Sequence, residues 1–135
     1  HEDPVKKAVS SNDKNWEIEI REMQHRDKVD APSGTALALG KTASLARKEN
    51  FDKVSKLSRE GKVGERKKDE IGFATLRGGS VVGDHTIILA HDDERIELTH
   101  KASNRKIYAN GAVKAAIWCS TQKKGLFSMT EVLGL

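Results

Sequence analysis

One stretch of the sequence constrains the fold more than any other, because a strand-like segment, a polar loop and a helix start follow one another directly. Apolar and charged residues alternate over Trp16–Met23, which indicates a half-buried strand. Pro32 cannot continue a preceding element, and Ser33 or Thr35 can cap the apolar run that follows. We therefore expect a helix over Ser33–Glu49. Its predicted apolar face contains Leu37, Ala38, Leu45 and Ala46 and is widened by Leu39 and Ala43. A slip of one residue would expose the apolar face of the strand, so its register is well defined.

The rest of the first hundred residues adds short strands and turns. Strands are expected at Val54–Leu57, Ile71–Leu76, Val81–Val82, Thr86–Ala90 and Arg95–Thr99, with an interruption at Gly83-Asp84 and the last turns of a helix at Val5–Ser10. The charged segment 59–68, which carries two glycines, is predicted to be a mobile loop. Several strands with one strong helix indicate an α+β fold, in which a mixed sheet packs the Ser33–Glu49 helix on one face.

The last third of the chain has a different character. A helix is predicted over Tyr108–Cys119, and an apolar tail follows Gly125. So much apolar side chain at a terminus is expected to be covered by another part of a protein. We divide the chain into residues 1–102, which hold the sheet, and residues 103–135, the helix and tail. Residues 1–4 are expected to be vector sequence or the stub of a longer chain.

Charge and composition favour a cytoplasmic protein with a small-molecule partner. The chain carries 24 basic and 20 acidic residues, which give a net charge of +4 over 135 residues. Acidic residues are mixed among the basic ones and aromatic residues make up 4%, so we expect no nucleic-acid binding. Cys119 is the only cysteine, which excludes an internal disulfide and is typical of a reducing compartment. No apolar run approaches the length of a membrane span.

The predicted start of the helix suits a small anion. The first amides of a helix have no partner within it and carry the positive end of its dipole, and Gly34 lets a ligand approach the backbone closely. Thr35 adds a hydroxyl donor, Lys28 a positive charge and His25 an imidazole. Each feature alone also fits an ordinary capped helix, a surface lysine or a histidine bound to a carbonyl. Together, between a strand and a helix, they predict a site that binds a carboxylate and can move a proton.

Other kinds of catalytic site are not supported by the sequence. His85, His91 and His100 lack metal-ligand spacing, so we expect no metal site. No nucleophile elbow with a Ser-His-Asp order is present. The glycines within residues 78–83 lead into a strand instead of a helix, which makes them a poor phosphate loop.

A segment of thirteen residues, Gln24–Ala36 (QHRDKVDAPSGTA), closely resembles the signature of the dihydrodipicolinate reductase family, also called 4-hydroxy-tetrahydrodipicolinate reductase. Further segments are similar in family order: Ser58–Gly61, Gly64–Arg66, Ile71–Arg77, Val82–His85, Thr99–Ser103 and Ala109–Val113. The resemblance runs from about Val5 to the C-terminus. It implies reduction of a cyclic dicarboxylate, 4-hydroxy-tetrahydrodipicolinate, with NADH or NADPH on the route to diaminopimelate and lysine.

The resemblance also implies roles for individual residues. Lys28 matches the catalytic lysine of the family, and His25 matches a histidine that contacts the substrate. Ser33, Gly34 and Thr35 match the turn that holds a substrate carboxylate. Two further residues, Arg105 and Tyr108, lie where family members approach the cofactor.

Two departures from the family pattern bear on activity. Gln24 stands where the family has the histidine taken as the proton donor, and an amide supplies no titrating proton near neutral pH. Loss of a general acid typically costs about 10²–10⁴-fold in rate. The N-terminal dinucleotide-binding domain of the family is not in this sequence. We therefore expect an inactive fragment whose tail packs on that domain and whose sheet builds a homotetramer; the alternative is a non-catalytic dicarboxylate-binding or assembly module.

Overall fold

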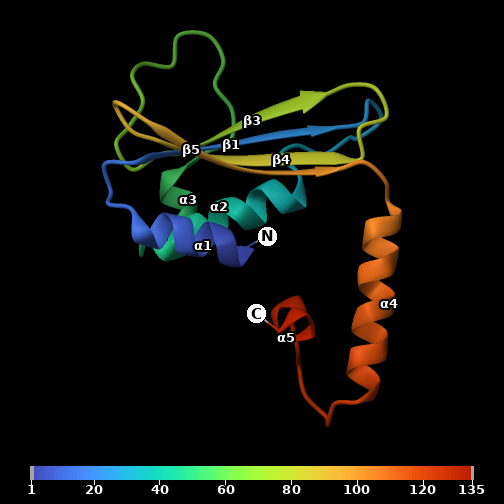
Figure 1. The fold of residues 1–135 in the computed structure, drawn as a ribbon. Coiled ribbons are helices and arrows are strands. Elements are labelled where there is room, and N and C mark those ends of the chain that lie inside the picture. The colour runs from blue at the N-terminus through green and yellow to red at the C-terminus, as the bar shows by residue number, and fades with distance from the viewer. Residues whose placement is uncertain (1, 135) are drawn as a thin grey trace. The chain divides into compact units, whose positions relative to one another are not determined.

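The computed structural model describes residues 2–134 and confirms the α+β fold, with a mixed sheet and a helix near the C-terminus (Figure 1). The chain forms two compact units, one ending at Lys101 and the other beginning at Ala102.

The first unit is built around a five-stranded sheet with the strand order β2-β3-β1-β4-β5. The strands are β1 (Glu17–Gln24), β2 (Ser55–Lys56), β3 (Ile71–Arg77), β4 (Gly83–Ala90) and β5 (Arg95–Ala102). The central strand, β1, pairs in parallel with β3 and antiparallel with β4. Residues that face each other across these pairs include Glu22 with His85 and with Thr75. One position at the end of β1 is thus brought beside two other strands.

Three helices cover one face of the sheet: α1 (Glu2–Ser11), α2 (Gly34–Ala46) and the short α3 (Phe51–Val54) (Figure 1). Ile18 and Ile20 of β1 point toward them and are fully buried, as the alternating sequence predicts. Val5 and Val9 add the apolar face of α1 to the same core. Helix α2 packs closely at Gly40, where a Cβ atom would lie 2.6 Å from the Phe73 ring and 2.9 Å from the Phe51 ring.

Two details of the sequence prediction are wrong. Strand β4 is continuous from Gly83, because Asp84 pairs with Met23 of β1 where an interruption was expected, and Val81-Val82 precede the strand. The apolar face predicted for α2 is correct at Leu39 and Ala43 but wrong at Leu45. Its buried residues are Ala36, Leu39, Gly40, Ala43 and Ser44, and Leu45 is 74% exposed.

The face of the sheet away from the helices carries a tethered loop. Glu19 of β1 accepts two hydrogen bonds from Arg59, of 2.7 and 2.9 Å, and one of 3.0 Å from Arg66. Gly72 on the neighbouring strand leaves room for this carboxylate, since a Cβ there would lie 2.2 Å from Glu19 Oε2. The segment 59–68, predicted to be mobile, is therefore tied to the sheet at two arginines.

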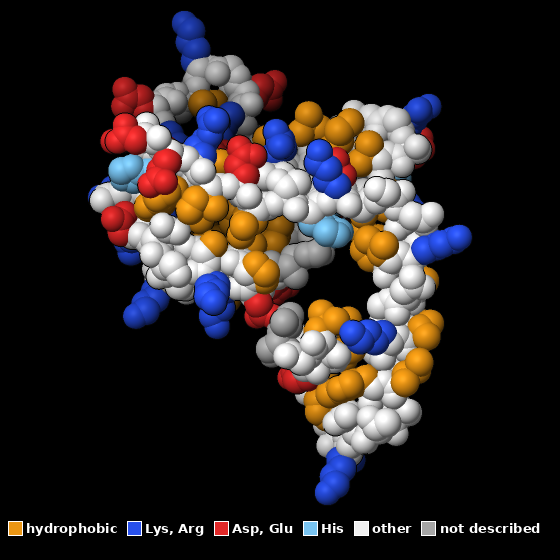
Figure 2. All heavy atoms as spheres, in the orientation of Figure 1, with side chains coloured by type: hydrophobic (Ala, Val, Ile, Leu, Met, Phe, Trp, Pro, Cys, Tyr) orange, Lys and Arg blue, Asp and Glu red, His pale blue; other side chains and the backbone are white. Residues whose placement is uncertain are grey.

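The second unit consists of α4 (Lys106–Ser120) and α5 (Met129–Leu133). Trp118 packs edge-to-face on Phe127, with the ring centroids 5.1 Å apart, and joins α4 to the segment before α5. Hydrophobic side chains nevertheless remain exposed along α4, among them Val113 and Ile117, the latter 66% exposed (Figure 2). Two such helices bury too little apolar surface to form a core of their own.

Candidate functional site

The side chain of Ser33 caps the first turn of α2, and residues 33–36 form the helix entrance. Ser33 is buried, has an extended backbone, and accepts a 3.1 Å hydrogen bond from the Ala36 amide at its Oγ. The helical ladder begins at Leu37, whose amide donates to the Ser33 carbonyl. Gly34 and Thr35 lie at the surface, and their amides have no hydrogen-bond partner among the described residues. These two amides are at the positive end of the helix and available to an anion.

A buried carboxylate lies directly behind this entrance. Glu22 is 1% exposed, and its Oε1 accepts a 2.8 Å hydrogen bond from the Ser33 amide. On the neighbouring strand β3, Thr75 Oγ1 and Arg77 Nη2 lie 3.3 and 3.4 Å from the same oxygen. The other oxygen, Oε2, accepts a 3.0 Å bond from Gln24 Nε2. Glu22 thus joins the end of β1 to the start of α2.

The surroundings of Glu22 keep it ionised. Burial alone would raise the pKa of this carboxyl, but the hydrogen bonds from Ser33 and Gln24, together with the Arg77 charge, outweigh burial and lower the pKa below its usual value. The Glu22 carboxylate is therefore a fixed negative charge inside the site at neutral pH.

A buried imidazole completes this cluster. His85 Nε2 lies 3.1 Å from Ser33 Oγ and 3.6 Å from Glu22 Oε2. Burial lowers the pKa of His85, the Glu22 carboxylate opposes that shift, and the charges of His100 and Lys28 contribute in the same direction as burial. His85 is accordingly neutral at pH 7.

The loop before α2 is braced by charged groups. Lys28 Nζ forms a 2.6 Å ion pair with Asp30 Oδ1, and the Lys28 side chain is only 17% exposed. The Lys28 amide donates to the carbonyl of His25, which closes a turn at the end of β1. Arg77, already in contact with Glu22, donates a 2.7 Å hydrogen bond to the Asp30 carbonyl. The loop is therefore linked to the Glu22 cluster through one arginine.

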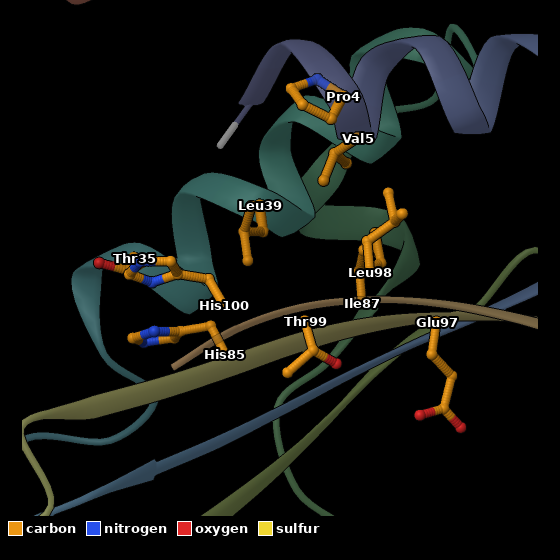
Figure 3. Close-up of a pocket in the computed structure, with 10 residues that line it drawn as sticks. All are labelled: Pro4, Val5, Thr35, Leu39, His85, Ile87, Glu97, Leu98, Thr99 and His100. Carbon is orange, nitrogen blue, oxygen red and sulfur yellow. The ribbon is translucent and has the colours of Figure 1, made fainter. Parts of the chain in front are cut away.

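A pocket of about 420 Å³ opens beside the helix entrance, between the helices and the sheet (Figure 3). Its walls are apolar where α1 and the sheet supply Val5, Ile87 and Leu98. Thr35, His85 and His100 line the end of the pocket at the start of α2. His85 therefore contacts the buried cluster with one edge and borders the pocket as well.

The chain is similar to proteins of a known family. The family model for dihydrodipicolinate reductase, C-terminus, matches residues 4–133. The chain belongs to this family.

Curated relatives support the assignment. The chain is 55% identical over 131 residues to a 4-hydroxy-tetrahydrodipicolinate reductase from Rhodopseudomonas palustris (strain BisA53), covering 97% of this chain and 48% of the relative. The enzyme of that name from Agrobacterium fabrum is 53% identical over 128 residues, covering 95% of this chain and 46% of the relative. The chain thus spans about half the length of the curated reductases it matches, and it is homologous to their C-terminal half.

A solved structure shows the same fold at lower identity. It is described as a dipicolinate-bound dihydrodipicolinate reductase from Paenisporosarcina sp. TG-14, with a TM-score of 0.61 and 21% sequence identity. The similarity covers 99% of this chain and 46% of that one.

The residues predicted from the family signature fall into two groups. In the first unit, Ser33, Gly34 and Thr35 form the helix entrance, Gln24 is bonded to Glu22, and the turn at His25 leads to Lys28. Lys28 makes no hydrogen bond to the entrance in this structure, because its ammonium group is paired with Asp30. Arg105 and Tyr108 are exposed at the start of α4, in the second unit. These two are not part of the cluster in the first unit.

Sequence reasoning missed four members of the cluster: Glu22, Thr75, Arg77 and His85. A signal for Glu22 was present, since it continues the buried row of Ile18 and Ile20 at the next alternate position. A charged residue on the apolar face of a strand is rarely buried without partners, and so indicates a polar site.

The described residues do not form a complete dinucleotide site. No strand among residues 2–134 leads through a glycine-rich turn into a helix, and Arg105 and Tyr108 are the only groups here that the family resemblance places near a cofactor. The same residues include no cluster of three or more His, Cys, Asp or Glu side chains suited to a metal ion. None of their helices is long and apolar enough to cross a membrane.

Proposed function

We propose that this chain is the dicarboxylate-binding half of a cytoplasmic, NADH- or NADPH-dependent reductase that converts 4-hydroxy-tetrahydrodipicolinate to tetrahydrodipicolinate, in diaminopimelate and lysine biosynthesis. Membership of the reductase family supports the reaction class. The observation that carries the proposal is the pair of exposed, unpartnered amides of Gly34 and Thr35 at the positive end of α2.

Each group at the entrance has a role in binding. The amides of Gly34 and Thr35, with the Thr35 hydroxyl, bind one carboxylate of the ring compound. Lys28 exchanges its Asp30 partner for the ligand, which places an ammonium group where it neutralises charge and can give up a proton. His25, at the start of the same turn, contacts the ligand from the strand side.

Hydride chemistry needs more than this chain supplies. The nicotinamide cofactor provides the hydride in such a reaction, and the family resemblance implies that Arg105 and Tyr108 of this chain approach it. We propose that a dinucleotide-binding domain precedes Val5 in the parent protein, and that residues 2–134 alone bind the dicarboxylate without turnover. The sequence upstream of Val5 tests this point, since it should contain a glycine-rich dinucleotide fingerprint.

Two exposed surfaces are proposed to take part in assembly. The apolar side chains of α4 and α5 are proposed to pack against the dinucleotide domain, because their own unit leaves them exposed. The face of the sheet opposite the helices is proposed to build a homotetramer.

Titration of the chain with pyridine-2,6-dicarboxylate tests the site. We expect the amide signals of Gly34 and Thr35 to shift in NMR spectra as the compound saturates, and pyridine-2-carboxylate to bind more weakly because it has one carboxylate fewer. Lys28→Gln should weaken binding, whereas Lys14→Gln, on a distant ion pair with Glu49, should not. Absence of any shift at Gly34 and Thr35 under excess ligand would contradict the proposal.

A second candidate function is a non-catalytic dicarboxylate-binding or assembly module. Gln24 favours it, because this side chain donates to Glu22 and supplies no titrating proton. The two functions separate when the chain is joined to a dinucleotide domain and NADPH oxidation is followed with Gln24 and with Gln24→His. Activity only with histidine would support the module, and comparable activity with glutamine would support the enzyme.

A further inference from the structure

Glu22 occupies a place in the core that favours an apolar residue. It continues the row of Ile18 and Ile20 on the helix-covered face of β1 and is 1% exposed. Burying an ionised carboxylate costs several kcal/mol unless hydrogen bonds compensate. An apolar side chain would avoid that cost, so the carboxylate at this position needs an explanation beyond packing.

The partners of Glu22 come from four different elements of the fold. Its two oxygens contact the Ser33 amide before α2, Gln24 at the end of β1, Thr75 and Arg77 on β3, and His85 on β4. Charge-assisted hydrogen bonds of this kind are about twice as strong as neutral ones. One carboxylate therefore fixes groups that the backbone alone would leave independent.

Two of these partners border the proposed dicarboxylate site. The Ser33 amide is held by Glu22 while Ser33 Oγ holds the Ala36 amide, so Ser33 is bonded on both sides of the entrance. Residues 34 and 35 lie between these two bonds, and the direction of their free amides is set by them. At the other oxygen, the bond from Gln24 Nε2 restricts the side chain that precedes His25.

We infer that Glu22 is a positioning residue of the dicarboxylate site: its buried carboxylate holds the Ser33 cap and the Gln24 side chain in one geometry, so that the binding groups are oriented before the ligand arrives. This inference rests on the function proposed above. Preorganised groups raise affinity because the cost of ordering them is not incurred on binding.

The negative charge of Glu22 and the hydrogen bonds of its side chain have opposite expected effects on ligand affinity, which makes the inference testable. A buried negative charge near an anion site repels the ligand, so its removal alone would tighten binding. Loss of positioning would instead weaken binding. Glu22→Gln removes the charge and replaces one of the two acceptor oxygens with an amide donor, which would face either the Gln24 donor at Oε2 or the Ser33 and Arg77 donors at Oε1. Glu22→Asp keeps the charge but withdraws the oxygens by one methylene from Ser33.

The first experiment measures the dissociation constant of pyridine-2,6-dicarboxylate for the whole chain by NMR titration. We expect Glu22→Gln and Glu22→Asp each to weaken binding by about tenfold while both remain folded. Glu19→Gln is the matched control, because Glu19 lies on the same strand, on the opposite face, in an ion pair with Arg59. It should leave the dissociation constant unchanged. Unchanged or tighter binding by the folded Glu22 variants would overturn the inference.

A second measurement needs no substitution and stays informative if the Glu22 variants fail to fold. In the wild-type chain, the side-chain ¹³C carboxyl signal of Glu22 and the amide side-chain signal of Gln24 should move with the same midpoint as the Gly34 and Thr35 amides. The Glu19 carboxyl signal should stay still. If Gly34 and Thr35 respond while Glu22 and Gln24 do not, the inference is wrong and the proposed function stands. If Gly34 and Thr35 do not respond either, the proposed function fails and the inference fails with it.

Discussion

The backbone amide of Ser33 donates a 2.8 Å hydrogen bond to Oε1 of Glu22, which precedes it by eleven residues in the chain. This bond ties the first turn of α2 to the central strand. Ser33 Oγ at the same time accepts from the Ala36 amide, so one residue both caps the helix and anchors it to the sheet. The entrance is thus a product of the fold.

Ser33→Ala should lower the free energy of unfolding by about 0.5–2 kcal/mol, the usual cost of losing a side-chain cap. The substitution removes the acceptor for the Ala36 amide and the contact with His85, but leaves the backbone bond to Glu22. Urea denaturation followed by circular dichroism measures the change. Ser33→Thr keeps a hydroxyl and should retain most of the stability. An unfolding midpoint for the alanine variant equal to wild type would show that the cap contributes nothing.

Asp30→Asn should tighten binding of pyridine-2,6-dicarboxylate about two- to fivefold at low salt. Asp30 competes with the ligand for the Lys28 ammonium group, and an ion pair whose carboxylate side chain is 61% exposed contributes little energy that the ligand must overcome. Isothermal titration calorimetry at two salt concentrations measures the effect, which should shrink at high salt because screening weakens the competing pair. Weaker binding by the asparagine variant would indicate that Asp30 orients Lys28 instead of competing for it.

His85 should make the chain less stable as pH falls below neutral. Burial lowers the pKa of His85 in the folded state, so its contribution to stability is present above the unfolded value of 6.5 and is lost as pH falls from there through the folded pKa. One proton changes stability by at most about 1.4 kcal/mol per pH unit. The free energy of unfolding, measured by denaturation at several pH values between 7.5 and 5, should therefore fall less steeply with decreasing pH for His85→Gln. This substitution keeps a polar group beside Ser33. Equal slopes would mean that His85 does not resist protonation.

The sequence predicted the parts of the site that depend on local chemistry. The alternation from Trp16 to Met23 predicted β1, and Pro32 with Ser33 predicted the start of α2, because strand faces and helix caps are encoded by neighbouring residues. The cluster behind the entrance depends on pairing between strands instead. His85 meets Glu22 only through the antiparallel register of β1 and β4. Alternation determines which face of β1 is buried, but it does not specify which residue of β4 lies opposite Glu22.

The buried face of α2 could likewise not be predicted fully from the sequence pattern. Leucines gave the stronger apolar signal, yet Leu45 is exposed while Gly40 and Ser44 are buried. Close approach of the helix to the aromatic rings of Phe51 and Phe73 needs a small residue, and hydrophobicity patterns do not weigh that need.

Gly40→Ala should destabilise the chain by about 1–3 kcal/mol, the typical cost of overpacking. The added methyl group would meet the Phe73 ring at 2.6 Å, and this outweighs the better helix propensity of alanine. Thermal unfolding of the variant gives the magnitude. A second substitution, Phe73→Leu, should restore part of the loss in the alanine background but destabilise the wild type, which a double-mutant cycle would report as a favourable coupling. Additive effects would place the strain elsewhere.

Gln24→His should create a titrating group whose pKa lies above the ordinary value for histidine. Gln24 Nε2 donates a 3.0 Å hydrogen bond to Glu22 Oε2, so an imidazole at this position can direct an N–H at the same carboxylate. An opposite charge at hydrogen-bond distance favours the protonated form, and the half-buried position opposes this only in part.

A titration of the new imidazole by ¹H–¹³C NMR measures that pKa directly. Adding Glu22→Gln should then lower it, because the carboxylate that stabilises the imidazolium is gone, while Glu19→Gln on the opposite face of β1 should leave it unchanged. A pKa that is unchanged by Glu22→Gln would show that the side chain at position 24 does not interact with the Glu22 carboxylate. The expected response would show that this scaffold keeps the carboxylate needed to make residue 24 a proton donor, and that glutamine alone withholds the proton.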